Sequence, residues 1–119
     1  MRLLIVEDSE PVAGRLRVAF AAIPALAVAT AAGIGAAEEI VDAWQPDVVI
    51  LDIQLPDGSG LALLRSIKRE RPATHVLMFS NHTCLRQRCE NEGADAFFDK
   101  GMEFEALMDA VRSLSKVAA

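Results

Sequence analysis

The sequence predicts a doubly wound α/β fold, in which helices cover both faces of a five-stranded parallel sheet. Two observations support this prediction. Five short apolar runs alternate along the chain with segments whose apolar residues recur at helical spacing, and each crossover between parallel strands must bring its helix back onto the sheet. In addition, 119 residues, of which 52% are hydrophobic, suit one packed domain over residues 1–119.

The five apolar runs are expected to form the strands. The third run is apolar at every position and lacks the alternation of a half-exposed strand, which is typical of an interior strand covered on both faces. We expect the strand order 2-1-3-4-5, which places this run at the centre of the sheet. The expected strands are residues 3–6, 25–29, 48–51, 76–79 and 96–98.

Apolar residues at helical spacing predict a helix after each strand. Ser9 is expected to cap the first helix, with Pro11 in its first turn. The fourth helix, roughly residues 82–92, has few apolar contacts beyond Leu85 and Cys89 and should be the least firmly docked. The other helices are marked by Leu16, Phe20 and Ile23, by Ala37, Ile40, Val41 and Trp44, by Leu61, Leu64 and Ile67, and by Phe104, Leu107, Met108, Val111 and Leu114.

Composition and charge argue against several classes of partner and site. A formal net charge of -5 without a basic block disfavours direct binding of DNA or RNA. No segment resembles a signal peptide or is long enough to span a bilayer, so we expect a cytoplasmic protein with no membrane partner. The spacing of Cys84 and Cys89 does not match a metal-binding pair, and both are expected to be reduced. The Gly-Ile-Gly at residues 33–35 is a poor dinucleotide fingerprint, because Glu38 stands where its third small residue belongs.

Polar or charged residues stand at the carboxyl ends of four predicted strands. Glu7 and Asp8 follow the first strand, Asp52 follows the third, Ser80 ends the fourth and Lys100 follows the fifth. In the expected order the first, third and fourth strands are neighbours, and ligands bind beyond this edge in open α/β sheets. Three carboxylates in one crevice repel one another unless a cation is present. The pattern therefore implies a divalent metal, and oxygen ligands favour Mg²⁺.

These residue types can accept a phosphoryl group. Asp52 is flanked by the other groups and is the candidate nucleophile, while the metal would neutralise the incoming phosphoryl group. The Ser80 hydroxyl and the Lys100 ammonium would bind its other oxygens. Each residue alone has an ordinary explanation as a helix cap or a solvated turn residue. The required type at each of four strand ends favours the functional interpretation.

This spaced set of Glu7, Asp8, Asp52, Ser80 and Lys100 resembles the receiver domain of the two-component response regulators over essentially the full chain. The resemblance implies a flavodoxin-like fold, Mg²⁺ bound by the acidic pair and Asp52, and phosphorylation of Asp52. Ser80 and Lys100 match the hydroxyl residue and the lysine of the family.

The same resemblance implies roles for further residues. The segment LDIQLPDGSG resembles the loop after the phosphoacceptor, in which the backbone carbonyl two residues on, here that of Gln54, completes the metal shell. Phe97 occupies the aromatic switch position. Gln54 and His82 stand at variable positions that influence the phosphoryl lifetime in the family. Gly101 departs from the proline of many relatives, which predicts a looser loop before the last helix.

The function that follows is a phosphorylation-operated switch and not an enzyme acting on outside substrates. A sensor histidine kinase or phosphotransfer protein would donate the phosphoryl group. The face formed by the fourth helix, fifth strand and fifth helix would meet a downstream protein or an output domain, and the chain is expected to be either a free-standing receiver or the front part of a longer regulator. Two alternatives stay open. A Mg²⁺-dependent aspartyl-phosphate phosphatase would use the same carboxylates but usually needs an aspartate where Gln54 stands, and an inactive receiver would serve only as a binding module.

Overall fold

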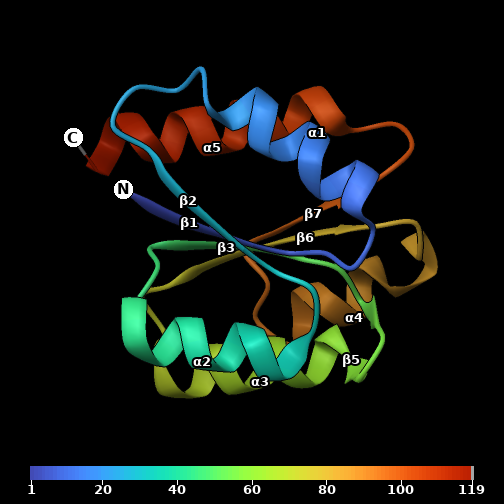
Figure 1. Ribbon diagram of the computed structural model, residues 1–119. Helices are drawn as coiled ribbons and strands as arrows, with labels where there is room; N and C mark the ends of the chain where they lie inside the picture. Colours follow the sequence, from blue (N-terminus) through green and yellow to red (C-terminus); the bar gives the residue numbers. More distant parts are fainter. Residues whose placement is uncertain (119) are drawn as a thin grey trace.

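The computed structural model describes residues 1–118 and contains the predicted parallel sheet (Figure 1). Its five strands are ordered β2-β1-β3-β6-β7, which confirms the expected order. Val6 pairs with Leu51, and Leu51 pairs with Met78, so three neighbouring strands end at one edge. The strands are β1 (Arg2–Val6), β2 (Ala27–Ala31), β3 (Val48–Leu51), β6 (His75–Ser80) and β7 (Ala96–Asp99).

The second strand begins later than predicted. Ala25 has a φ of 61°, a left-handed conformation that does not fit a strand. The amino group of Met1 donates a hydrogen bond to the carbonyl oxygen of Ala25 at 3.1 Å. The strand therefore starts after this turn, at Ala27, and continues to Ala31.

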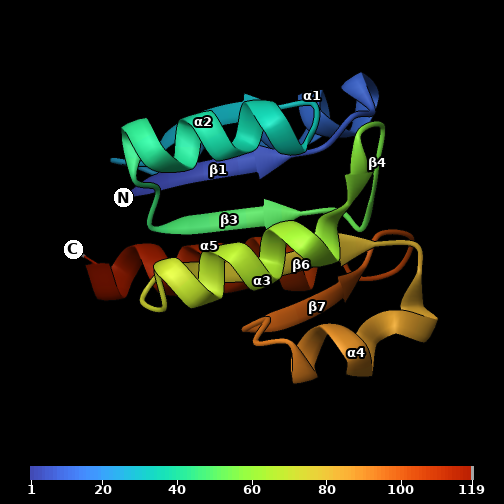
Figure 2. The same ribbon diagram turned by 90° about the horizontal axis from the view of Figure 1, so that it is seen from below.

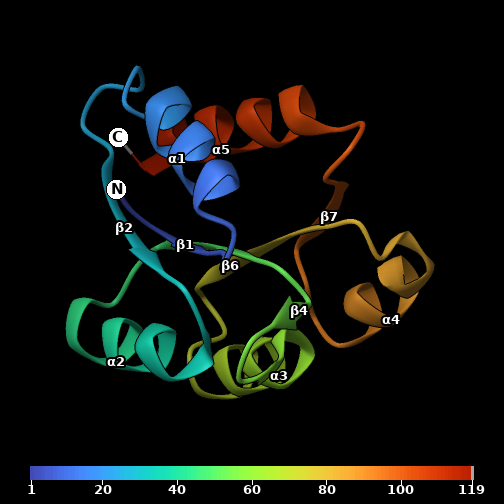
Figure 3. The same cartoon turned by 45° about the vertical axis from the view of Figure 1, so that its right-hand side comes forward.

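Helices cover both faces of the sheet, with α1 and α5 on one face and α2, α3 and α4 on the other (Figures 1 and 3). Ser9 precedes α1 as predicted, but its side chain makes no capping hydrogen bond. Ile23 was expected in the first helix; it lies beyond the helix end and packs against the core. Within residues 1–118, every helix is too short or too polar to cross a membrane. The helices are α1 (Glu10–Phe20), α2 (Ile34–Trp44), α3 (Gly60–Glu70), η1 (Thr83–Leu85), α4 (Arg86–Asn91) and α5 (Phe104–Ala118).

The core consists of two apolar clusters, one on each face of the sheet. Strand β3 contributes to both, with Val49 and Leu51 facing α2 and α3, and Val48 and Ile50 facing α1 and α5. All four side chains are buried. This burial explains why the strand is apolar at every position, and it fixes the residue after the strand, Asp52, at the edge of a rigid layer.

The predicted fourth helix consists of two short pieces, η1 and the six-residue α4 (Figure 2). Helix α4 buries only Cys89, whereas α3 buries five residues. Leu85 is half-buried, and Cys84 is exposed; both cysteines are free. Hydrophobic burial therefore contributes little to the docking of α4, as its sequence predicted.

The loop after β3 contains a β-hairpin that the sequence analysis did not predict. Strand β4 (Gln54–Leu55) pairs antiparallel with β5 (Gly58–Ser59), and Figure 2 shows the start of this excursion at β4. The Gly60 N–H donates to the Ile53 carbonyl oxygen at 2.6 Å and closes the base of the hairpin. Each strand has only two residues, which is too short for a recognisable strand pattern, so the Pro-Asp-Gly segment indicated only a loop.

Candidate functional site

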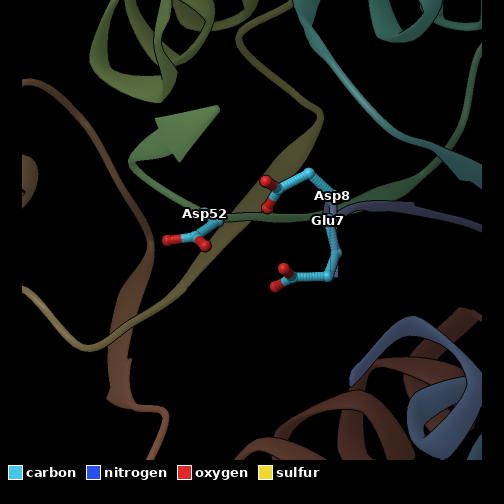
Figure 4. Close-up of side chains that lie close together, drawn as sticks. All are labelled: Glu7, Asp8 and Asp52. Atoms are coloured by element: carbon cyan, nitrogen blue, oxygen red, sulfur yellow. The ribbon is translucent and has the colours of Figure 1, made fainter. Parts of the chain in front are cut away.

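Three carboxylates meet at the carboxyl edge of the sheet, as the strand order predicts. Glu7 and Asp8 follow β1 and Asp52 follows β3, and one oxygen from each lies within 4.8 Å of the others (Figure 4). Glu7 and Asp52 are 6% and 7% exposed, whereas Asp8 is exposed to solvent. Carboxylate oxygens are the ligands that Mg²⁺ prefers, and one exposed member leaves room for the waters that this ion retains. The donor set therefore fits Mg²⁺.

Lys100 lies in the same cluster. It follows β7, and its Nζ lies 2.7 Å from Glu7 Oε2 and 2.7 Å from Asp52 Oδ2. The Lys100 N–H donates to the Ser80 carbonyl oxygen at 3.1 Å, which holds the loop after β7 against the end of β6. The ammonium thus neutralises part of the negative charge that the sequence predicted for this crevice.

Burial and hydrogen bonds together shift the pKa values of Glu7 and Lys100. It raises the pKa of the Glu7 carboxyl above its usual value, although Lys100 and the Ser9 N–H stabilise the charged form. For Lys100, burial alone would lower the pKa, but the hydrogen bonds to Asp52 and Glu7 outweigh it and the pKa is raised. Lys100 is therefore cationic at neutral pH.

The backbone holds Asp52 closely. Its Oδ1 accepts a hydrogen bond from the Ile53 N–H at 2.7 Å, which leaves Oδ2 for Lys100. A Cβ at Gly60 would lie 1.9 Å from the Asp52 carbonyl oxygen, so only glycine fits where α3 begins. The apolar run therefore brings the Asp52 carboxylate to the edge of the sheet, and Gly60 lets the chain pass closely behind it.

A pocket of about 390 Å³ opens over these groups. Gln54 and His82 are exposed residues of its lining, and His82 Nε2 and Gln54 Oε1 form a hydrogen bond of 3.0 Å. This contact joins the hairpin after β3 to the loop after β6. The pocket is lined by Glu7, Asp8, Ser9, Val12, Asp52, Gln54, Leu55, Pro56, Asn81, His82 and Lys100.

Ser80 and Phe97 lie behind this pocket and not on its surface. Ser80 is fully buried, and its Oγ accepts a hydrogen bond from the His82 N–H at 3.1 Å. Phe97 is 3% exposed and belongs to the core on the side of α2 and α3. The Arg86 guanidinium lies 4.9 Å from the centre of the Phe97 ring and donates to the Phe97 carbonyl oxygen at 2.9 Å. The structure thus brings Glu7, Asp8, Asp52 and Lys100 together in the pocket. The Ser80 hydroxyl is buried and does not line the pocket.

Two interactions around the site were missed from the sequence. The Asp57 carboxylate accepts hydrogen bonds from the N–H groups of Ile34 and Gly35, which start α2. Arg86 also donates to Glu103 Oε1 at 2.6 Å, so α4 is tied to the loop before α5. Both interactions join segments far apart in the sequence. The sequence signals were the Gly-Ile-Gly at the start of α2 and the aspartate in the turn of the hairpin, and nothing local pairs the two.

Comparisons with known proteins agree with this geometry. The profile of the response regulator receiver domain matches residues 3–112. The TorCAD operon transcriptional regulatory protein TorR of Escherichia coli strain K12 is 32% identical over 94% of this chain and 49% of that protein. Protein-glutamate methylesterase/protein-glutamine glutaminase 2 of Cereibacter sphaeroides is 40% identical over 66% of this chain and 22% of that protein. The chain thus spans about half or less of the length of these relatives.

Solved structures show the same fold. The signal receiver domain of a DNA-binding response regulator from Colwellia psychrerythraea 34H superposes with a TM-score of 0.89 at 22% identity, covering 98% of both chains. Response regulator TrrA from Thermotoga maritima, solved in complex with Mg²⁺ and BeF, has a TM-score of 0.81 at 26% identity and covers 95% of this chain and 97% of its own. With the matched profile over residues 3–112, the chain belongs to the response regulator receiver domains of two-component systems.

Proposed function

We propose that this chain is a phosphorylation-operated switch in which Asp52 accepts a phosphoryl group from a sensor histidine kinase or a phosphotransfer protein. The observation that carries the proposal is the position of Asp52. Its carboxylate is nearly buried, lies 2.7 Å from the Lys100 ammonium, is flanked by Glu7 and Asp8, and lines the open pocket at the edge of the sheet.

The transfer would proceed by nucleophilic attack. An electron pair of an Asp52 carboxylate oxygen forms a bond to phosphorus, and the bond between phosphorus and the donor's nitrogen or oxygen breaks with its electron pair on the leaving group. Lys100 would exchange its contact with Asp52 for a phosphoryl oxygen, and the Ser80 hydroxyl would approach another oxygen. Attack by water on phosphorus would later restore the carboxylate and release inorganic phosphate.

Mg²⁺ belongs to this proposal. Glu7, Asp8, Asp52 and the backbone carbonyl of Gln54 are the groups that would hold it. When bound, the ion would neutralise charge on the phosphoryl oxygens, which lowers the repulsion between the donor and the acidic cluster.

Phosphorylation would be read out at the face of α4, β7 and α5. Movement of the Ser80 hydroxyl toward the phosphoryl group would leave space that Phe97 can enter. Helix α4 buries only Cys89, so it has little packing to resist the change. A downstream protein or an output domain would bind this face, without direct contact to nucleic acid or membrane.

The proposal treats residues 1–119 as one receiver domain in the cytoplasm. The domain would catalyse only its own phosphorylation and dephosphorylation. A phosphatase acting on outside substrates is disfavoured because Gln54 stands where such enzymes need an acid. A receiver that only binds partners would have no use for Asp52, Lys100 and the acidic pair in one pocket.

Mass spectrometry after incubation with acetyl phosphate and Mg²⁺ tests the proposal. One phosphoryl group should be added to the wild type and none to Asp52→Asn. Asp47→Asn is the matched control, because Asp47 is an exposed aspartate beside the opposite ends of β1 and β3, and it should be labelled like the wild type. An unchanged mass of the wild type would contradict the switch and favour a binding module.

A further inference from the structure

The hairpin after Asp52 is fastened to a distant helix by one acidic side chain. Asp57 lies in the turn between β4 and β5, and its Oδ1 accepts the Ile34 N–H at 2.8 Å while Oδ2 accepts the Gly35 N–H at 3.0 Å. These N–H groups belong to the first turn of α2 and have no partner within the helix. The residue before them, Gly33, has no side chain that could cap α2. Asp57 therefore provides the cap from another part of the chain.

Both sides of this contact are shaped for close approach. A Cβ at Gly33 would lie 2.7 Å from Asp57 Oδ1, so a larger residue there would displace the carboxylate. Gly58, next to Asp57, has a φ of +146°, and a Cβ there would lie 3.0 Å from the Ile34 side chain. The Gly-Ile-Gly at 33–35, which makes a poor dinucleotide fingerprint, thus fits an acid supplied by the chain itself. The hydrogen bonds that Asp57 accepts from the Gly35 and Ile34 N–H groups also lower its pKa, so it is charged at neutral pH.

The fastened hairpin begins within the phosphoacceptor loop. Gln54 is the first residue of β4, two positions after Asp52. The Ile53 N–H donates to Asp52 Oδ1 at 2.7 Å, and the Ile53 carbonyl oxygen accepts from Gly60 at 2.6 Å. These two hydrogen bonds connect the backbone beside Asp52 to the base of the hairpin. A hairpin that is released from α2 is therefore expected to shift the backbone from Asp52 to Gln54.

We propose that Asp57 is a positioning residue of the metal and phosphoacceptor site, which it controls by anchoring the β4–β5 hairpin to the first turn of α2. This inference rests on the proposed function, since the groups it positions are the Asp52 carboxylate and the Gln54 carbonyl oxygen offered to Mg²⁺. Partners that orient metal ligands typically contribute ten- to a hundredfold to affinity, although they do not touch the metal.

Two variants break the contact from opposite sides. Asp57→Ala removes the carboxylate. Gly33→Ala keeps the carboxylate but adds a Cβ in the space that the carboxylate occupies. In both, the amides of Ile34 and Gly35 should exchange with solvent faster, and the dissociation constant for Mg²⁺, measured by calorimetry on the folded protein, should rise about tenfold. Asp57→Asn retains an oxygen that can accept one of the two hydrogen bonds and should give an intermediate constant.

Asp47→Ala is the matched control. Asp47 is also exposed and also accepts a backbone N–H, that of Arg2 at 2.8 Å, but it lies at the other end of the sheet. Its variant should lose stability and keep the wild-type affinity for Mg²⁺. Wild-type affinity in Asp57→Ala and Gly33→Ala, with faster exchange at Ile34 and Gly35, would overturn the positioning role and leave the proposed function intact. A wild type that binds no Mg²⁺ would overturn the metal site itself.

Discussion

The Lys100 ammonium lies 2.7 Å from Asp52 Oδ2, and the two residues directly follow strands β7 and β3, which are separated in the sheet by β6. The same nitrogen lies 2.7 Å from Glu7 Oε2. Lys100 is therefore the internal counter-ion of the carboxylate cluster, and any anion that reaches Asp52 must compete for it.

Replacing Lys100 should destabilise the protein in the absence of metal. In Lys100→Met the nearly buried Glu7 and Asp52 lose their cation, so the free energy of unfolding should fall by on the order of 3 kcal/mol in chelator. Mg²⁺ should restore part of this loss by binding only the folded state. Urea denaturation with chelator and with Mg²⁺ measures both effects. The exposed Lys116, changed to Met, should cause almost no loss; equal losses in the two variants would refute the counter-ion role.

Stability should depend on pH through Glu103. Hydrogen bonds from the Asp99 N–H and from Arg86 lower the pKa of the Glu103 carboxyl. A carboxylate with a lowered folded pKa contributes stability above its unfolded pKa and loses it as pH falls through the folded value. Glu103→Gln should therefore lower the urea midpoint most at neutral pH, and the difference should vanish in acid. Glu105→Gln, at an exposed position two residues further on, is the matched control and should leave the urea midpoint at neutral pH nearly unchanged.

The hydrogen bond between Gln54 and His82 should lengthen the life of the phosphorylated state. It joins two lining residues of the pocket at 3.0 Å, and its removal should admit more water to the acyl phosphate. His82→Ala and Gln54→Ala should each speed the loss of the phosphoryl group, and the double variant should be no faster than the faster single one. Decay of the phosphorylated mass after removal of acetyl phosphate gives the rates. His75→Ala, exposed at the far end of β6, should decay like the wild type.

Signals from the site should pass through Phe97. With beryllofluoride as a phosphoryl mimic, amide chemical shifts should change mainly in residues 80–104. Phe97→Leu should reduce the changes beyond Ser80 without preventing phosphorylation of Asp52. Phe98 belongs to the opposite core cluster, and Phe98→Leu should leave the pattern unchanged. Changes restricted to the loops after β1 and β3 would mean that Phe97 is fixed core.

Elements of the fold and site that depend on one local rule are predictable from the sequence. Apolar runs predicted all five strands of the sheet, and acids directly after two of them predicted the carboxylate cluster, because parallel strands end at a common edge. The predicted start of β2 was wrong because alanine, unlike glycine, gives no signal for the left-handed conformation at Ala25.

Interactions between distant segments were beyond prediction. Aspartate and glycine are both common in loops, so neither residue type indicates a contact. The contact between Asp57 and Gly33 depends on how the hairpin lies against the start of α2. The same holds for Lys100. Its position after the fifth strand predicted a group that binds phosphoryl oxygens, but its pairing with Glu7 and Asp52 depends on how three separate loops meet. The contacts of Arg86 with Phe97 and Glu103 likewise depend on α4 lying beside β7.

The attachment of α4 makes the proposed partner face responsive to ionic strength. This helix buries one side chain, and Arg86 ties it to Glu103 at 2.6 Å with side chains that are 41% and 36% exposed. Dissolved salt screens exposed charges over about 8 Å at physiological concentration, whereas it barely weakens apolar packing. The attachments of the helices thus differ in kind. The larger helices are held to the sheet by apolar contacts that electrolyte barely affects, whereas α4, at the proposed partner face, depends more on charged contacts that electrolyte weakens.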